Sequence, residues 1–186
     1  CDVLLLSATP IPRTMMMSIY GDMDVSKITE KPNKRKKIVT LSKPETKTNE
    51  LWPLIRKKLN VNEQVFWVCP LIEESSFLDY TSAKKKFNII NQKFPNKVGL
   101  IHGALEKDEK EIILRKFLNK EILILVSTTV IEVGIDFPNA NLIIIENANK
   151  FGLAQLHQLR GRVGRNDMQS YCVLLHKKNI NETAKK

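Results

Sequence analysis

The chain has 186 residues, of which 42% are hydrophobic and 27% are charged, a balance typical of a folded globular protein and not of a disordered one. Thirty Lys and Arg residues against 20 Asp and Glu residues give a formal net charge of +10, which indicates either a polyanionic partner such as nucleic acid or simply a solvated basic surface. No apolar run approaches the roughly 20 residues of a membrane-spanning helix, so no membrane partner is expected.

The first part of the chain predicts one strand, one helix and a linker. Residues 3–6 are a short apolar run, and Ser7-Ala8-Thr9 follows at the C-terminal edge of this predicted strand, where α/β proteins bind their ligands. Residues 11–20 predict a short helix. From residue 27 the chain becomes rich in lysine and poor in apolar residues, so residues 27–46 are predicted to be a linker. Lysines of such a run either follow a phosphate backbone or, more commonly, are only solvated.

Beyond the linker, apolar runs alternate with amphipathic segments. Helices are predicted over residues 51–59, 80–94, 106–118 and 153–163, and strands over residues 65–69, 98–101, 122–126, 142–145 and 171–175. Strands that are apolar throughout and separated by helices indicate an α/β fold with a mostly parallel sheet covered by helices on both faces.

The most informative segment lies between residues 155 and 165. At about 100° per residue, a continuous helix would place two amides and two guanidiniums on one face. These residues are Gln155, Gln158, Arg162 and Arg165. Two glycines inside the segment, at about 1 kcal/mol each in a helix, indicate either close backbone approach or an early helix end. A guanidinium donates paired hydrogen bonds to phosphate oxygens and stays charged, which suits phosphoryl transfer; the alternative is a surface helix with ordinary salt bridges.

Residues 158–165 resemble motif VI of the superfamily 2 helicases, Q-x-x-G-R-x-G-R. Residues 7–9 resemble motif III and residues 127–136 resemble motif V, in the order that the family shows. The resemblance covers nearly the whole chain. It is closest to the RecG and transcription-repair coupling factor families, and residues 66–75 favour the first of these.

This resemblance implies a RecA-like lobe of the P-loop NTPase type. Residues 1–26 would be the trailing segment of a first helicase lobe, 27–46 the interlobe linker, 47–180 the second lobe and 181–186 a tail. The implied function is that of the second motor lobe in an ATP-dependent double-stranded DNA translocase that remodels stalled forks and Holliday junctions in recombination and repair. ATP with Mg²⁺ would bind between the two lobes. The implied partners are branched double-stranded DNA and the first lobe and wedge domain of the same full-length chain.

The residue roles that the motifs imply form four sets. They are the catalytic Arg162 and Arg165, the nucleotide-binding Gly134, Asp136 and Gln158, the nucleic-acid-binding Gly103, Thr128 and Thr129, and the coupling residues Ser7 and Thr9. Independently of the resemblance, the hydroxyls of residues 127–129 follow an apolar strand, where they can hold phosphates or cap a helix.

The sequence lacks a phosphate-binding loop, because none of its seven glycines belongs to a G-x-x-x-x-G-K-[ST] motif. Asp108-Glu109-Lys110-Glu111 has the letters of an acidic metal-binding motif, but it opens a predicted helix, where acidic residues complement the helix dipole. The family's phosphate loop and acidic box are therefore expected upstream of Cys1, and the chain alone is expected not to hydrolyse ATP. No metal ligands are predicted.

Two further interpretations remain beside the motor. The same lobe could come from a transcription-repair coupling factor, with RNA polymerase as a partner, or the chain could be a non-catalytic DNA-binding module. The three cysteines, Cys1, Cys69 and Cys172, are far apart and odd in number, which predicts free thiols and a cytoplasmic location. Because the chain opens directly into a strand-like run, it is expected to be a piece of a longer protein.

Overall fold

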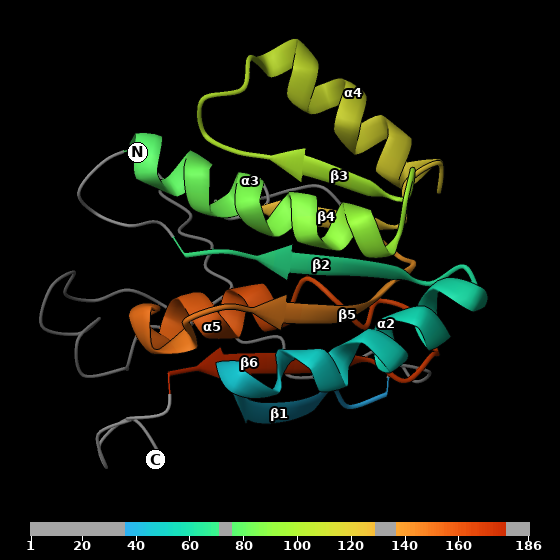
Figure 1. Ribbon diagram of the computed structural model, residues 1–186. Helices are drawn as coiled ribbons and strands as arrows, with labels where there is room; N and C mark the ends of the chain where they lie inside the picture. Colours follow the sequence, from blue (N-terminus) through green and yellow to red (C-terminus); the bar gives the residue numbers. More distant parts are fainter. Residues whose placement is uncertain (1–35, 71–75, 129–136, 178–186) are drawn as a thin grey trace, which may run out of the picture. The chain divides into compact units, whose positions relative to one another are not determined.

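The computed structural model describes residues 36–70, 76–128 and 137–177 (Figure 1). Strands and helices alternate along them. The strands are β1 Val39–Pro44, β2 Gln64–Val68, β3 Val98–Ile101, β4 Ile124–Ser127, β5 Ala140–Ile145 and β6 Tyr171–His176. The helices are α2 Leu51–Asn60, α3 Ser76–Lys93, α4 Lys107–Leu118 and α5 Leu153–Arg160, with 3-10 turns at η1 Glu45–Glu50 and η2 Ala148–Lys150. The strand and helix predicted within residues 1–26, with Ser7 and Thr9, lie outside the described residues.

The six described strands form a single sheet in the order β1-β6-β5-β2-β4-β3. Every neighbouring pair is parallel, so the carboxyl ends of all six strands meet at one edge, as the arrowheads in Figure 1 show. The predicted α/β class and the parallel sheet are confirmed.

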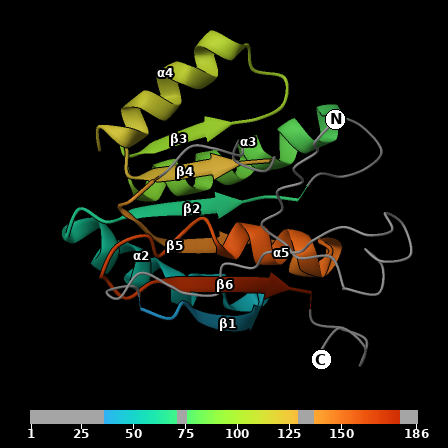
Figure 2. The same ribbon diagram turned by 180° about the vertical axis from the view of Figure 1, so that it is seen from behind.

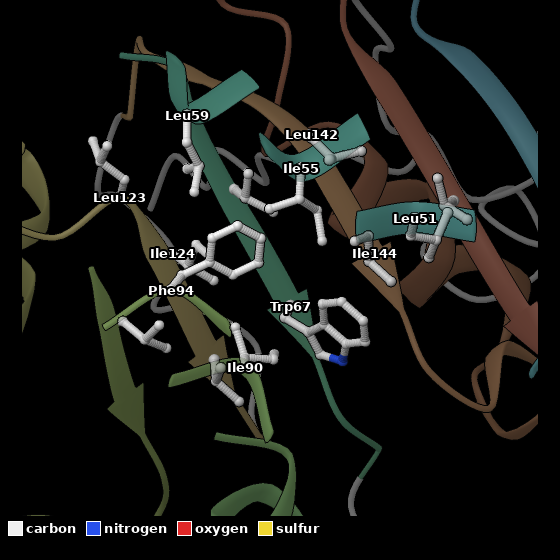
Figure 3. Packing of buried hydrophobic residues seen from close by; sticks show 14 of the residues in the cluster. Leu51, Ile55, Leu59, Trp67, Ile90, Phe94, Leu123, Ile124, Leu142 and Ile144 are labelled. Carbon is white, nitrogen blue, oxygen red and sulfur yellow. The ribbon is translucent and has the colours of Figure 1, made fainter. Parts of the chain in front are cut away.

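The central strands are buried on both faces, and alternate side chains enter two separate apolar clusters. On the face covered by α2 and α3, Trp67 packs among Ile90, Ile144 and Leu51 (Figure 3). On the opposite face, which carries α5 and is turned forward in Figure 2, Phe66 of β2 contacts Phe117 of α4, with ring centroids 5.2 Å apart. Since full burial of such a side chain contributes about 1.5–3 kcal/mol, β2 contributes to the stability of both layers.

Gly99 lies where β3 packs closely against the following α4 segment. A Cβ atom at this position would clash with the side-chain ends of Ile122 and Ile113. A larger residue would therefore force these side chains to shift.

Strand β1 lies inside residues 27–46, the segment interpreted as a linker, so part of this segment has regular structure. Four of its six residues are exposed, and among the described strands it pairs with β6, in the register Val39↔Tyr171. An edge strand buries little of its surface, so it lacks the apolar run by which the inner strands are recognised.

A buried lysine of α2 makes an ion pair and also a hydrogen bond to the turn before β6. Lys58 Nζ lies 2.6 Å from Glu63 Oε2, and their side chains are only 11% and 8% exposed. The same ammonium donates to Gln169 O at 3.0 Å and lies 5.2 Å from the centroid of the Tyr171 ring. The charge of Lys58 is thus satisfied inside the fold.

Replacing Lys58 by Met should therefore lower the free energy of unfolding of the 186-residue chain by about 3–5 kcal/mol, because Glu63 would remain buried without its cation. Urea denaturation followed by circular dichroism measures this change. The double variant Lys58→Met, Glu63→Met should recover a large part of the loss. Lys43→Met is the matched control, since it breaks an exposed pair with Glu50 and should change stability far less; an equal loss in both single variants would contradict the prediction.

Candidate nucleotide and nucleic-acid site

The turn after β3 and the end of β4 are neighbours at the carboxyl edge of the sheet. Ile101 and Ser127 are paired in the register of these strands, and the Thr128 N–H donates to Ile101 O at 3.2 Å. Gly103 is exposed, whereas Thr128 is buried, with 3% of its surface exposed. The structure thus brings two of the predicted nucleic-acid-binding residues together, and Gly103 is the one that faces solvent.

Two lysines lie near this turn. Lys110 Nζ donates to Gly103 O at 3.3 Å. Partial burial lowers the pKa of His102, and the nearby ammonium groups of Lys110 and Lys84 lower it further, while Glu109 opposes them. The two ammonium groups can contact a phosphate backbone, although the acidic first turn of α4 lies beside them.

Gly103 is not required by the packing of the chain. A Cβ atom at this position would meet nothing within 4 Å, in contrast to Gly99. The absence of a side chain instead leaves the backbone open to a ligand that approaches closely.

The ends of β2 and β5 carry a half-buried charged cluster at the same edge. Lys86 Nζ lies 2.5 Å from Glu146 Oε1 and 5.2 Å from the centroid of the Trp67 ring. Cys69 Sγ donates to Glu146 Oε2 at 3.6 Å. Burial raises the pKa of Cys69 well above its usual value, and the Glu146 carboxylate raises it further. This thiol is consequently a weak nucleophile.

Helix α5 ends at Arg160, with Gly161 as its C-cap. The prediction that one continuous helix carries the two glutamines and the two arginines on a single face is therefore wrong. Gln155 and Gln158 lie on α5 and are exposed, but Gln155 Oε1 accepts the N–H of Gly152 at 3.0 Å and so caps the helix. Of the two explanations for the glycines, the early helix end is confirmed. Gly161 itself keeps right-handed backbone angles, φ −68° and ψ −8°, and the left-handed glycine of this segment is Gly164, at φ +75°.

Arg162 and Arg165 instead flank two buried residues, Val163 and Gly164, in the loop that returns to β6. Val163 is fully buried in the apolar cluster on the face of the sheet that carries α4 and α5. Gly164 has a φ of +75° and donates its N–H to Ala140 O at 3.2 Å. Partial burial lowers the pKa of Arg162, and the guanidinium of Arg165 lowers it further. The two like charges are therefore near each other, as an anion-binding pair requires.

The structure separates the two groups of predicted site residues. Ala140 is the first residue of β5, so the loop of Arg165 reaches the amino edge of the sheet, whereas Gly103 and Thr128 lie at the carboxyl edge. Thr129, Gly134 and Asp136 fall outside the described residues. Arg160, the last residue of α5, lies 3.2 Å from His157 Nδ1 through its Nη2 atom.

One contact of this loop was missed by the sequence analysis. Asn166 Nδ2 donates to Pro138 O at 2.7 Å, and Asn166 Oδ1 accepts the N–H of Met168 at 3.0 Å. The Asn166-Asp167 pair is a turn signal in the sequence, but its long-range partner is visible only in the fold.

The described residues contain no group of three or more His, Cys, Asp or Glu side chains that could hold a metal ion. Asp108 and Glu109 form the first turn of α4, where Glu109 Oε2 accepts the N–H of Glu106 at 3.3 Å. The interpretation of this acidic run as a helix start is confirmed. Among the described helices, none has the length and apolarity needed to cross a membrane.

Comparison with known families agrees with this geometry. Residues 46–167 match the family described as the helicase conserved C-terminal domain. The chain belongs to this family. The match includes β2 to β5, the turn at Gly103 and the Arg162–Arg165 loop, and leaves only β1 and β6 of the described strands outside it.

Curated relatives of the chain are ATP-dependent DNA helicases named RecG. The chain is 47% identical to the Bacillus subtilis protein over 176 residues, which are 94% of this chain and 26% of the relative. It is 48% identical to the Thermotoga maritima protein, over 94% of this chain and 23% of the relative, and 44% identical to the Escherichia coli K12 protein, over 97% and 26%. The chain thus spans about a quarter of the length of these relatives.

Solved structures give the same picture. A structure of RecG bound to a three-way DNA junction matches with a TM-score of 0.80 and 44% identity, covering 96% of this chain and 23% of that one. The C-terminal domain of the DEAD-box protein Dbp5 matches with a TM-score of 0.53 and 18% identity, covering 78% and 79%. The second likeness concerns the fold alone, and the two matches together identify a RecA-like fold.

Free thiols are confirmed for Cys69 and Cys172, both buried. Burial also raises the pKa of Cys172, to about 11. Because a raised pKa lowers the thiolate fraction at a given pH, iodoacetamide at pH 8 should modify neither residue in the folded chain and both in urea, where the pKa returns to about 8.5. Peptide mass spectrometry resolves the sites; rapid labelling of Cys69 in the native chain would contradict this expectation.

Proposed function

We propose that the chain is the second motor lobe of an ATP-dependent, cytoplasmic double-stranded DNA translocase that remodels branched DNA in recombination and repair. The observation that carries the proposal is the paired Arg162 and Arg165, on a loop that the buried Val163 anchors, in a chain that resembles RecG proteins over 94% of its length. That resemblance favours a RecG-type motor over a transcription-repair coupling factor or a non-catalytic module.

The nucleotide would be ATP, because the chain's own groups suit a triphosphate. Two neighbouring guanidiniums, one of them partly desolvated, can donate paired hydrogen bonds to phosphate oxygens and stabilise the charge of the transferring phosphoryl group. Gln158 is exposed on α5 two residues before its end and would contact the nucleotide with Gly134 and Asp136. When bound with ATP, Mg²⁺ would supply the charge neutralisation at the phosphates.

A first lobe of the same full-length chain would complete this site, since the sequence has no phosphate-binding loop and the described residues have no group of three or more His, Cys, Asp or Glu side chains that could hold a metal ion. We place the end of that lobe at residues 1–26, the linker at 27–46 with β1 in its second half, this lobe at 47–180 and a tail at 181–186. Ser7 and Thr9 would couple the lobes. Closure around ATP and reopening after hydrolysis would then move the two lobes along DNA.

Nucleic acid would bind at the carboxyl edge of the sheet. The exposed backbone of Gly103, the ammonium of Lys110 and Thr129 would contact phosphates of branched double-stranded DNA, and the buried Thr128 would take part through its backbone beside them. This set contains phosphate contacts only, which position a duplex without reading its sequence.

In the full-length protein, Arg162→Ala or Arg165→Ala should lower the kcat of DNA-stimulated ATP hydrolysis by roughly 10³-fold, because the transition-state charge loses a guanidinium. Steady-state ATPase assays with a forked duplex measure this. DNA affinity should stay within about twofold, since the loop of Arg165 lies at the opposite edge from Gly103. Arg160→Ala is the matched control, with a much smaller effect expected because Arg160 contacts His157; unchanged turnover in both test variants would exclude the finger role.

Lys110→Gln should weaken binding of the full-length protein to duplex DNA and reduce the slope of log affinity against log salt by about 1, since one phosphate contact is lost. Fluorescence anisotropy at several salt concentrations measures both quantities. Lys116→Gln removes the same charge from the last turn of α4, at the other end of the helix, and should change neither. Equal effects of the two variants would show that net charge alone attracts the DNA.

A further inference from the structure

The backbone of Arg165 is held between two hydrogen bonds that reach the same short segment. On its N-terminal side, the Gly164 N–H donates to Ala140 O at 3.2 Å. On its C-terminal side, the Asn166 side chain donates to Pro138 O at 2.7 Å. Pro138 and Ala140 are two residues apart, so Arg165 is clamped at both neighbours against one point of the fold.

The segment that receives these bonds is itself firmly anchored. Phe137 is 1% exposed and packs against Phe66 and Phe117, with ring centroids 5.3 and 5.4 Å away. The Gln64 N–H donates to Asn139 O at 2.8 Å, and the Ala140 N–H donates to Phe137 O at 3.1 Å. A loop tied to this turn shares the rigidity of the aromatic core.

We propose that Asn166 is a positioning residue that fixes the backbone of Arg165 and thereby the direction in which its guanidinium extends. The inference rests on the proposed function, in which Arg165 stabilises the transferring phosphoryl group. Asn166 itself touches no reacting atom. Its bond removes freedom that Arg165 would otherwise lose during the reaction, so it acts on the rate of the bound complex and not on nucleotide affinity.

The two amide atoms of Asn166 can be tested separately. Asn166→Asp keeps an oxygen that accepts the Met168 N–H but lacks the N–H that donates to Pro138 O, whereas Asn166→Ala loses both bonds. Both variants of the full-length protein should lower kcat about 10-fold, with KM for ATP within about twofold and the melting temperature nearly unchanged. A loss in Asn166→Ala alone would assign the effect to the Met168 turn and overturn the proposal.

Two controls separate this bond from charge and from general loosening of the loop. Met168→Glu adds a negative charge at an exposed position, 46% accessible, without removing the Asn166 to Pro138 bond. Gln169→Ala removes an equivalent bond of the same loop, from Gln169 Nε2 to Lys37 O at 2.9 Å. Both controls should keep wild-type kcat; a 10-fold fall in either would overturn the specific role of Asn166.

Failure of this inference is distinguishable from failure of the proposed function. If Arg165→Ala abolishes turnover while Asn166→Asp has wild-type kcat, the positioning role alone is wrong. If Arg165→Ala retains wild-type turnover, the proposed finger role is wrong and the positioning role falls with it.

Discussion

The central strands β2, β4 and β5 are buried on both faces of a parallel sheet, and the rest of the structure depends on this burial. Side chains of β2 enter opposite apolar clusters, with Trp67 on the α2–α3 face and Phe66 on the α4–α5 face. Because every strand runs in the same direction, the chain must return through a helix or loop after each one. All carboxyl ends then share one edge, and every return segment reaches the other edge.

This constraint separates the two groups of candidate site residues. The turn at Gly103 follows β3 and lies at the carboxyl edge, with Lys110 and Thr128 beside it. The loop of Arg162 and Arg165 is a return segment, fastened to the start of β5 through Gly164. In the function proposed above, DNA and nucleotide would contact opposite edges of one rigid sheet and would not compete for the same surface.

Rigidity in the return loop comes from long-range contacts that a sequence pattern does not show. Val163 is buried, Gly164 adopts a left-handed conformation, and Asn166 reaches Pro138, 28 residues away. A short helix that stops at Arg160 leaves the next residues free to take these positions. Had α5 continued, Arg165 would have been displaced along the helix axis, away from the turn at Pro138–Ala140.

The sequence by itself determined the α/β class and the inner strands, because a continuous apolar run is a local signal of a strand that is buried on both faces of a parallel sheet. Only the tertiary structure decided that residues 39–44 form an edge strand, that α5 ends early and that Arg165 is clamped by Asn166. Each of these depends on a partner far along the chain. The edge strand pairs with β6, the turn at Gly164 is bonded to Ala140, and Asn166 is bonded to Pro138. Local propensity is too weak to specify such contacts, since tertiary hydrogen bonds and burial outweigh it.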